Sequence, residues 1–211
     1  MTESTIRRGL VDAAEHRFAL DGIAQASLRA VMREANADPG AIHYHFGGRE
    51  ALAIAVLERV LVPLNAKRLV LLQDAVTSAA DGVPSLNALV DALIRPDVEV
   101  ATELNGRGSG RARLIGAIYL DPASFVKAEV EKHFAPVAQR FMPHLIDTVS
   151  AVPGPILAWR VRWFVFGVVG ALMADDEAPF EIDQGELIDR LVSTACAALA
   201  APSPQEGSAW K

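Results

Sequence analysis

The sequence predicts an all-α protein with an N-terminal three-helix domain, built around a helix-turn-helix, and a larger C-terminal helical domain. Apolar residues make up 51% of the 211 positions, and good helix formers such as Ala, Leu, Val, Arg and Glu dominate. Apolar positions recur at helical spacing along most of the chain, and no long alternating pattern typical of strands is present. A chain of this length and apolar content can form one or two domains with ample cores.

The stretch from Ser27 to Arg49 has the clearest local pattern in the chain. Ser27 precedes one apolar helix face, made of Leu28, Val31, Met32 and Ala35. Asn36 follows this face and is expected to adopt the left-handed conformation that ends a helix. Asp38 and Pro39 have the pattern of an N-cap followed by proline at the first helical position. The stretch therefore predicts two short helices joined by a tight turn.

The second of these helices has an outer face that stability alone does not explain. At about 100° per residue, Ile42 and Phe46 face inward, whereas Gly40 and Tyr44 point outward. One interpretation is an ordinary helical hairpin with a polar surface. We favour a helix-turn-helix whose second helix enters the major groove of double-stranded DNA. The residues expected to bind DNA are Ser27, Arg29, Asp38, Gly40, Ala41, His43, Tyr44, His45 and Arg49. Arg49, at the start of the next helix, is expected to contact phosphate.

The run LRAVMREANADPGAIHYHFGGREAL closely resembles the N-terminal domain of the TetR family of transcriptional regulators. The positions that match the family pattern are Gly40, Ile42, His45, Phe46 and Leu52. Arg49 stands where the family usually has Lys, and Asn36 replaces the turn Gly. Asp38 replaces a Ser or Thr that often touches phosphate, and His43 takes a usual Tyr position. The resemblance covers roughly residues 5–60 and implies a DNA-binding regulator.

The charge distribution does not point to bulk affinity for nucleic acid. The chain has a formal net charge of −6. Residues 1–60 hold 7 Lys and Arg against 8 Asp and Glu, and residues 61–211 hold 13 against 18, so the acidity lies mostly in the C-terminal part. This balance leaves specific operator binding open but argues against strong nonspecific binding.

The domain organisation follows from helix breakers and from the resemblance. Residues 1–50 are expected to form the DNA-binding domain, 51–201 the regulatory and dimerisation domain, and 202–211 a disordered tail. A loop is expected at 105–111, where three glycines alternate with other residues. Four prolines are expected to kink, end or divide helices, namely Pro63, Pro96, Pro136 and Pro143.

The segment Ile156–Ala174 is apolar nearly all round, which predicts burial on most sides. It could be the central helix of a monomer. In the TetR family, however, the last two helices of each subunit pair across a two-fold axis as a four-helix bundle, so the resemblance implies a homodimer. The residues expected in the dimer interface are Trp163, Gly167, Gly170, Ala171 and Leu191.

A weaker resemblance covers the C-terminal part. The segments RLIGAIYLDPASFVK, HFAPVAQRFMPHL and WRVRWFVFGVVGAL are similar to a branch of TetR regulators that includes fatty-acid and acyl-CoA responders. This implies a small, apolar effector. The residues expected to line its pocket are Leu114, Ile118, Phe134, Phe141 and Phe164. The same side chains would also serve as plain core.

The sequence contains no recognisable catalytic grouping. G-x-S-x-G and H-E-x-x-H motifs are absent, and His43 and His45 lie about 200° apart around their helix, so they cannot chelate one metal ion. We therefore expect no enzyme activity, no cofactor and no metal. The favoured function is a ligand-responsive regulator, most readily a repressor, that binds a pseudopalindromic operator as a homodimer. The alternatives are a constitutive DNA-binding protein and, less favoured, an enzyme on a helical scaffold.

A cytoplasmic location is expected. The single cysteine, Cys196, excludes an internal disulfide and is typical of a reducing compartment. No apolar segment of a signal peptide follows Met1. The longest apolar run, Trp163–Ala174, spans 12 residues, fewer than the roughly 20 that cross a membrane, so no membrane partner is expected.

Overall fold

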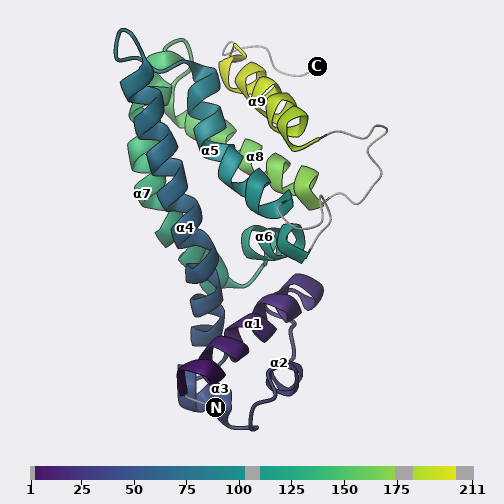
Figure 1. The fold of residues 1–211 in the computed structure, drawn as a ribbon. Helices are drawn as coiled ribbons and strands as arrows, with labels where there is room; N and C mark the ends of the chain where they lie inside the picture. Colours follow the sequence, from purple (N-terminus) through teal and green to yellow (C-terminus); the bar gives the residue numbers. More distant parts are fainter. Residues whose placement is uncertain (1–2, 103–109, 174–182, 203–211) are drawn as a thin grey trace.

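The computed structural model describes residues 3–102, 110–173 and 183–202 (Figure 1). Within these ranges the secondary structure is helical throughout. The helices are α1 (Glu3–Asp21), α2 (Leu28–Glu34), α3 (Ala41–Phe46), α4 (Arg49–Ser78), α5 (Leu86–Thr102), α6 (Gly110–Leu120), α7 (Ser124–Thr148), α8 (Gly154–Met173) and α9 (Gln184–Ala200). The all-α fold class predicted from the sequence is confirmed.

The N-terminal end of the molecule is a small head made of α1, α2 and α3. Its core, here called the N-terminal core, unites buried residues of these helices with the first half of α4 down to Leu64. The same core includes Leu114 and Ile118 of α6 and Val126 of α7. The boundary expected after residue 50 coincides with the start of α4, but the apolar packing continues across it.

The long helix α4 joins this head to the rest of the molecule (Figure 1). Near the head, Arg59 of α4 bonds to two acidic residues of α1, at 2.5 Å to Glu15 and 2.6 Å to Asp12. These hydrogen bonds outweigh the opposing effect of burial and raise the pKa of Arg59 above its ordinary value. Glu15 also lies 3.9 Å from the Arg111 guanidinium of α6. Polar contacts therefore join α1 to both α4 and α6.

The prolines expected to break helices lie inside continuous ones. Pro63 lies within α4, Pro96 within α5, and both Pro136 and Pro143 within α7. A proline inside a helix costs about 3 kcal/mol because it removes a donor and crowds the preceding turn. These helices bury whole apolar faces, and Pro96 is itself buried in α5. Packing of the long faces outweighs the local cost, so the expected helix end at Pro96 and the expected breaks at the other three prolines are wrong, whereas a kink or bend at those three stays a prediction.

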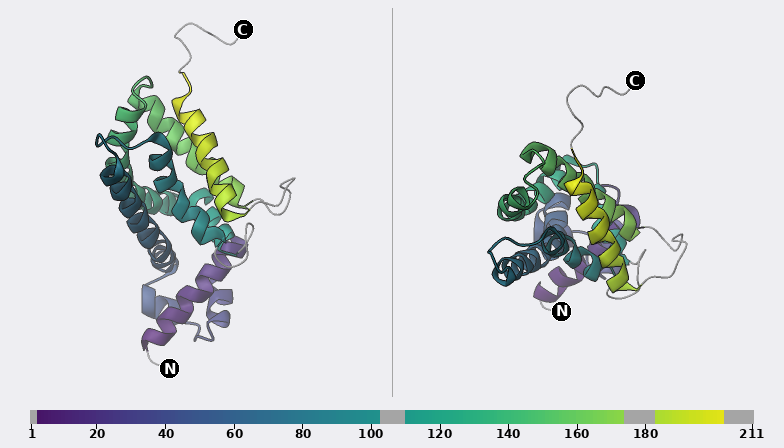
Figure 2. Two further views of the ribbon diagram at one scale, coloured as in Figure 1. Left: turned by 45° about the horizontal axis from the view of Figure 1, so that its top comes forward. Right: turned by 90° about the horizontal axis from the view of Figure 1, so that it is seen from above.

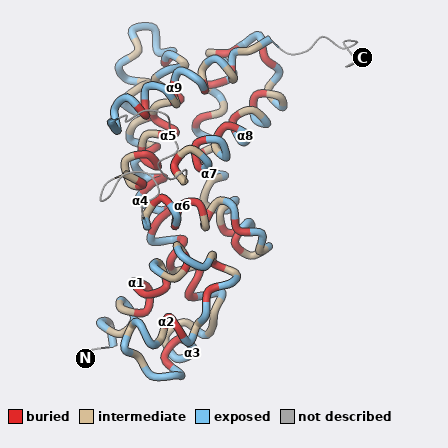
Figure 3. The backbone as a smooth tube through the Cα atoms, turned by 90° about the vertical axis from the view of Figure 1, so that its right-hand side faces the viewer, coloured by how far each residue is buried: buried red, intermediate tan, exposed pale blue. Residues whose placement is uncertain are grey.

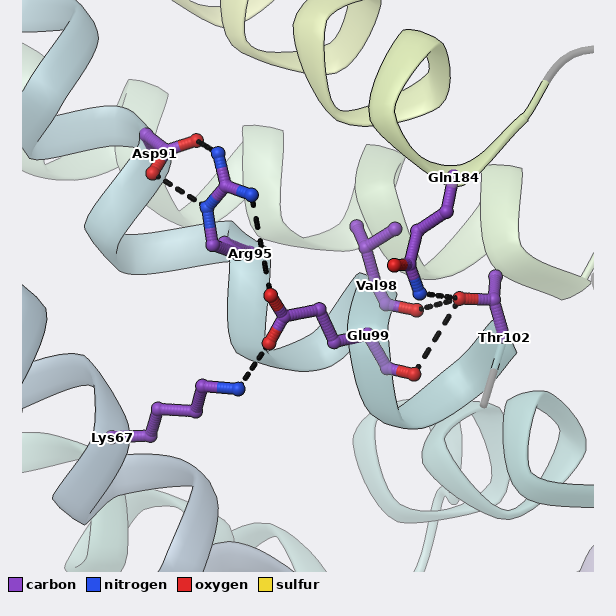
Figure 4. A network of polar contacts seen from close by, with 7 residues as sticks. All are labelled: Lys67, Asp91, Arg95, Val98, Glu99, Thr102 and Gln184. Carbon is purple, nitrogen blue, oxygen red and sulfur yellow. Dashed lines mark hydrogen bonds and ion pairs between the residues drawn. The ribbon is translucent and has the colours of Figure 1, made fainter. Parts of the chain in front are cut away.

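The C-terminal body packs α5, α8 and α9 together with parts of α4, α6 and α7 around a second apolar cluster, here called the C-terminal core. Figure 2 shows α9 on the outside of this body, beside α5 and α8. An ion-pair chain runs across its surface from Lys67 of α4 to Glu99, Arg95 and Asp91 of α5 (Figure 4). At the end of α5, Thr102 accepts a hydrogen bond from Gln184 of α9.

Helix α8 is more exposed than its composition suggests. With 20 residues, the helix is long and apolar enough to cross a membrane, judged by length and composition alone. In its most apolar stretch of 18 residues, 39% is buried inside the protein. One side packs in the C-terminal core, and the other is open (Figure 3). Within one chain the helix is therefore buried on one side only, and burial of its other side by a second subunit stays a prediction. Most of the loop expected at 105–111 and all but the first residue of the expected tail lie outside the described residues.

Candidate nucleic-acid interface and effector site

The turn between α2 and α3 largely follows the sequence prediction. Ser27 is the N-cap of α2, and its hydroxyl accepts a hydrogen bond from the Ala30 N–H at 3.4 Å. Asn36 has a φ of 53°, the left-handed conformation expected at this helix end. The start of α3 differs, because its N-cap is Gly40 and not Asp38. Asp38 instead accepts a turn hydrogen bond from the Ala41 N–H through its backbone carbonyl, at 2.9 Å.

Helix α3 presents its polar residues to solvent. The Tyr44 side chain is 76% exposed, and His43 is exposed beside it. The ring of His45 packs edge-on against Tyr44, with 4.9 Å between the ring centroids. Ile42 is buried as expected, but Ala41 is buried as well, in the N-terminal core. The Ala41 methyl group therefore faces the core, and its expected place in the DNA-binding surface is wrong.

The other residues expected to bind DNA surround this helix. Ser27, Arg29, Asp38 and Gly40 are all exposed. Arg7 of α1 is also exposed, and its guanidinium lies 4.8 Å from the centre of the Phe46 ring at the end of α3. The start of α1 lies next to α3 in Figure 1. Arg7 thus adds a cation beside α3 that the local helix-turn-helix pattern does not include.

Arg49 has partners inside the head. Its guanidinium donates to the carbonyl oxygen of Ala26 at 2.8 Å and to that of Ile23 at 3.4 Å. Both carbonyls belong to the loop between α1 and α2. The cation predicted to contact phosphate therefore holds this loop against the start of α4. Sequence spacing alone could not reveal these partners, because they lie more than twenty residues earlier in the chain.

An exposed apolar stripe follows the open side of α8. The Trp159 side chain is 65% exposed, Trp163 60% and Phe166 40%. A Cβ atom added at Gly167 or Gly170 would meet no other atom within 4 Å. Of the other residues expected in a dimer interface, Ala171 is partly buried, and Leu191 packs against the C-terminal core. Large apolar side chains exposed in a row are typical of a protein–protein contact.

A buried polar cluster that the sequence did not reveal joins α4, α5 and α6. Arg68 of α4 is 1% exposed and pairs with Asp97 of α5. Its guanidinium also donates to the Leu93 carbonyl at 2.9 Å, the Asn65 side chain at 2.5 Å and the Tyr119 hydroxyl of α6 at 3.3 Å. Burial opposes the charged form, but Asp97 and Tyr119 outweigh it and raise the pKa of Arg68. For Tyr119 the effect of burial has the opposite sign: burial disfavours the charged phenolate and so raises the pKa of the hydroxyl.

The residues expected to form the effector pocket divide between the two cores. Leu114 and Ile118 belong to the N-terminal core, whereas Phe141 and Phe164 are buried in the C-terminal core. Phe134 borders a small cavity of about 10 Å³, room for one water molecule. The cavity is lined by Arg68, Leu93, Ile94, Asp97, Phe134, Val165, Val168 and Val169. It lies between α4, α5, α7 and α8, and of the five residues expected in the effector pocket only Phe134 lines it.

Among the described residues, one group has side chains close enough to share a metal ion. The ligand atoms of Glu58 on α4 and of Glu129 and His133 on α7 lie within 4.8 Å of one another. Glu129 already pairs with His133 at 3.0 Å and with Lys132 at 2.8 Å. Glu129 and, more weakly, Glu58 raise the pKa of Lys132, so an ammonium group already offsets part of the negative charge of these two carboxylates.

A helix-turn-helix head joined by one long helix to an all-helical body defines a class of protein, the DNA-binding transcription regulators. Two family models agree with this class. Residues 10–56 match the model of bacterial regulatory proteins of the tetR family, and residues 91–200 match the tetracyclin repressor-like C-terminal domain. The chain belongs to the TetR family of transcriptional regulators.

Solved structures show the same fold. NalD, the secondary repressor of the MexAB-OprM multidrug efflux pump in Pseudomonas aeruginosa, is 17% identical with a TM-score of 0.62, and the match covers 93% of this chain and 98% of NalD. FadR from Bacillus subtilis, solved with stearoyl-CoA, is 11% identical with a TM-score of 0.65 and coverage of 90% and 98%. The regulator CifR, solved with 26-base-pair operator DNA, is 21% identical with a TM-score of 0.59 and coverage of 95% and 96%. A comparison with curated proteins finds no match.

Proposed function

We propose that this protein is a ligand-responsive repressor that binds a pseudopalindromic operator as a homodimer and is released by a small effector. The observation that carries this proposal is the exposure of Tyr44, 76%, on a short helix whose inner face is fully used by the core. An aromatic side chain gains nothing for stability in that position. Its place on the second helix of a helix-turn-helix supports contact with DNA bases in the major groove.

If α3 enters the major groove with Tyr44 toward the bases, the positions of the other expected contacts follow. Tyr44, His43 and Gly40 on the exposed side of α3 would meet base edges. The ring of His45 would support Tyr44 through their edge-on contact. Arg29 on α2 would contact phosphate beside the groove, and Ser27 at its start would lie at the same rim. Asp38 is exposed, and its negative charge would repel a phosphate group, so its side chain is not a proposed phosphate contact.

A homodimer would supply two such helices. Two recognition helices reach successive major grooves when they lie about 34–36 Å apart, one turn of B-DNA. The stripe of Trp159, Trp163 and Phe166 on α8 supports a self-complementary contact around a two-fold axis. Gly167 and Gly170 leave room for close approach of a second helix. Two proteins of the same fold support the repressor role: NalD is a repressor, and CifR is solved with operator DNA.

An effector would act by changing the spacing of the two heads. Arg68 ties the long helix α4 to α5 and α6, so a ligand in the body that moves these helices also moves the helix that carries the head. The ligand need only prefer the state that does not bind DNA. FadR with stearoyl-CoA supports a small-molecule effector in this fold. Such a regulator would work in the cytoplasm, where its operator lies.

The experiment is operator selection followed by binding. Purified full-length protein selects sites from random duplex DNA, and fluorescence anisotropy then measures the affinity for the selected site. Tyr44→Ala should lower that affinity at least tenfold. Val70→Ala, at a position on α4 that is 60% exposed, is the matched control and should bind like the parent. Failure to select any site, or equal affinities of the Tyr44→Ala variant and the parent, would overturn the DNA-binding assignment of α3.

A constitutive DNA-binding protein is the second candidate function. The described cavity between α4, α5, α7 and α8 favours it, because about 10 Å³ holds one water molecule and no effector without a structural change. The two candidates differ in one measurement. A ligand-responsive repressor loses its operator when its effector is added, whereas a constitutive binder keeps it in the presence of every compound that binds the body.

A further inference from the structure

Asp97 is a buried carboxylate with one oxygen paired and the other unpaired. Only 6% of the residue is exposed, and its Oδ2 accepts from Arg68. Its Oδ1 is buried and has no hydrogen-bond partner among the described residues. A buried acceptor left unpaired costs free energy, so native proteins usually supply a partner or an ordered water. Asp97 therefore has unused capacity to accept a hydrogen bond.

This carboxylate borders the cavity between α4, α5, α7 and α8. Asp97 and Arg68 form the polar end of that cavity. All the other lining residues are apolar, namely Leu93, Ile94, Phe134, Val165, Val168 and Val169. In the described state the space holds about one water molecule, which is large enough for a single polar group at the Asp97 end.

The charges at the polar end decide which group fits. Each guanidinium nitrogen of Arg68 already donates, to Leu93, Asn65, Asp97 and Tyr119. A ligand carboxylate would have to compete with Asp97 for Arg68, and the two anions would repel each other. A ligand cation would add a second positive charge to a pair that is already balanced. A neutral O–H or N–H donor satisfies Asp97 without adding charge.

We propose that the effector is a neutral amphiphile that widens this cavity by moving the valines of α8 apart, with its aliphatic body among them and one O–H or N–H donor bonded to Asp97 Oδ1. This inference rests on the proposed ligand-responsive function and names the ligand class. It departs from the expectation of a fatty-acid effector, because a free carboxylate is disfavoured at this end. The Asp97 carboxylate would bond to both the effector and Arg68, so binding of the effector would act directly on the Arg68 side chain of α4.

A pair of isomers tests the donor requirement. Octan-1-ol and 1-methoxyheptane have the same atoms, and only the alcohol carries an O–H donor. In isothermal titration calorimetry with the full-length protein, octan-1-ol should bind about tenfold more tightly than the ether, the ratio expected for one buried hydrogen bond. Sodium octanoate should bind more weakly than the alcohol. Equal affinities of the isomers, no binding of octan-1-ol up to its solubility limit, or tightest binding by octanoate would overturn the proposal.

Variants locate the effect at Asp97. In the double variant Arg68→Met with Asp97→Leu, the alcohol and ether should bind equally. The matched control is Arg95→Met with Asp91→Leu, which removes an ion pair of the same helix that lies away from the cavity (Figure 4). It should keep the tenfold ratio. Persistence of the ratio in the Arg68 and Asp97 variant would contradict the assignment.

A single conservative substitution gives a second test of the donor requirement, made on protein that still folds and binds its operator. Asp97→Asn keeps a carbonyl oxygen for Arg68 and turns an N–H donor toward the cavity, so the preference for the alcohol over the ether should vanish or invert. An unchanged tenfold preference would contradict the proposal. Operator binding measured on the same samples separates failure of the ligand class from failure of the proposed function. If the parent binds its operator but does not distinguish the alcohol from the ether, only the proposed class of effector is wrong. If the parent selects no operator, the proposed function itself is wrong.

Discussion

Asp121, directly after α6, accepts a hydrogen bond at 3.0 Å from the backbone N–H of Ala24, in the loop between α1 and α2. The other oxygen of the same carboxylate accepts from the Ala123 N–H at 2.9 Å, just before α7. Asp121 is 7% exposed. The body therefore holds the loop between α1 and α2 as well as α1 itself, and a movement of α6 would reach the loop that Arg49 also holds.

Asp121→Ala should destabilise the junction between head and body. Two partly buried N–H groups would lose their acceptor, which costs about 1–3 kcal/mol in the free energy of unfolding. Urea denaturation followed by circular dichroism measures this loss. Asp147→Ala, at an exposed position near the end of α7, is the control and should stay within about 0.5 kcal/mol of the parent. Equal stability of the two variants would show that the Asp121 contact contributes nothing.

Arg49→Ala separates two roles for the same side chain. Because its guanidinium bonds to the Ile23 and Ala26 carbonyls, we expect a lower melting temperature and an operator affinity reduced by a misplaced loop. The dependence of affinity on salt should keep its slope. A phosphate contact predicts the reverse, with an unchanged melting temperature and a slope reduced by about one unit. Differential scanning fluorimetry and anisotropy at several salt concentrations distinguish these outcomes.

Local signals in the sequence predicted the head well, and contacts between distant segments explain what they missed. Ser27 caps α2 and Asn36 has a positive φ because both properties depend on the immediate backbone. Leu114 and Ile118 were assigned to a pocket from their apolar character, yet α6 packs against α1, and their side chains complete the core of the head. Apolar character predicts burial but does not specify which core a residue joins.

The Arg68 cluster illustrates the same limit for polar residues. Arg68 lies on a long helix with no local partner of opposite charge, so the sequence suggests a solvated side chain. Its main partner, Asp97, lies 29 positions away on another helix. Only the packing of α4 against α5 brings the two together, at a cavity that both residues line, and leaves one carboxylate oxygen without a hydrogen-bond partner. No spacing rule within one helix could have located this site.

Gly167→Leu should block dimer formation while the single chain keeps its stability. In one chain an added Cβ would meet nothing within 4 Å, so the larger side chain has room and replaces a glycine in a helix with a better helix former. A second α8 packed on Gly167 would clash with it. Sedimentation velocity should show a dimer for the parent and a monomer for the variant. Ala135→Leu on the exposed side of α7 should remain a dimer, and a dimeric Gly167→Leu variant would place the interface elsewhere.

The last prediction concerns the buried pair of Arg68 and Asp97, which are 1% and 6% exposed. Asp97→Leu alone leaves the Arg68 guanidinium buried without its counter-charge, and this should cost about 3–5 kcal/mol in the free energy of unfolding. Replacing both residues, by Arg68→Met and Asp97→Leu, removes the charges together and fills similar volume. The double variant should therefore be close to the parent in stability or above it.

Urea denaturation of the parent, both single variants and the double variant forms a double-mutant cycle. We expect the stability loss of the double variant to be smaller than that of either single variant, because each single change leaves one charge buried without its partner. Additive losses would mean that Arg68 and Asp97 contribute independently, through packing or through Tyr119 and Asn65. The effector could then change the hydrogen bonds of Asp97 without any effect on Arg68. The proposed route from the effector through Asp97 to α4 would lack its physical basis.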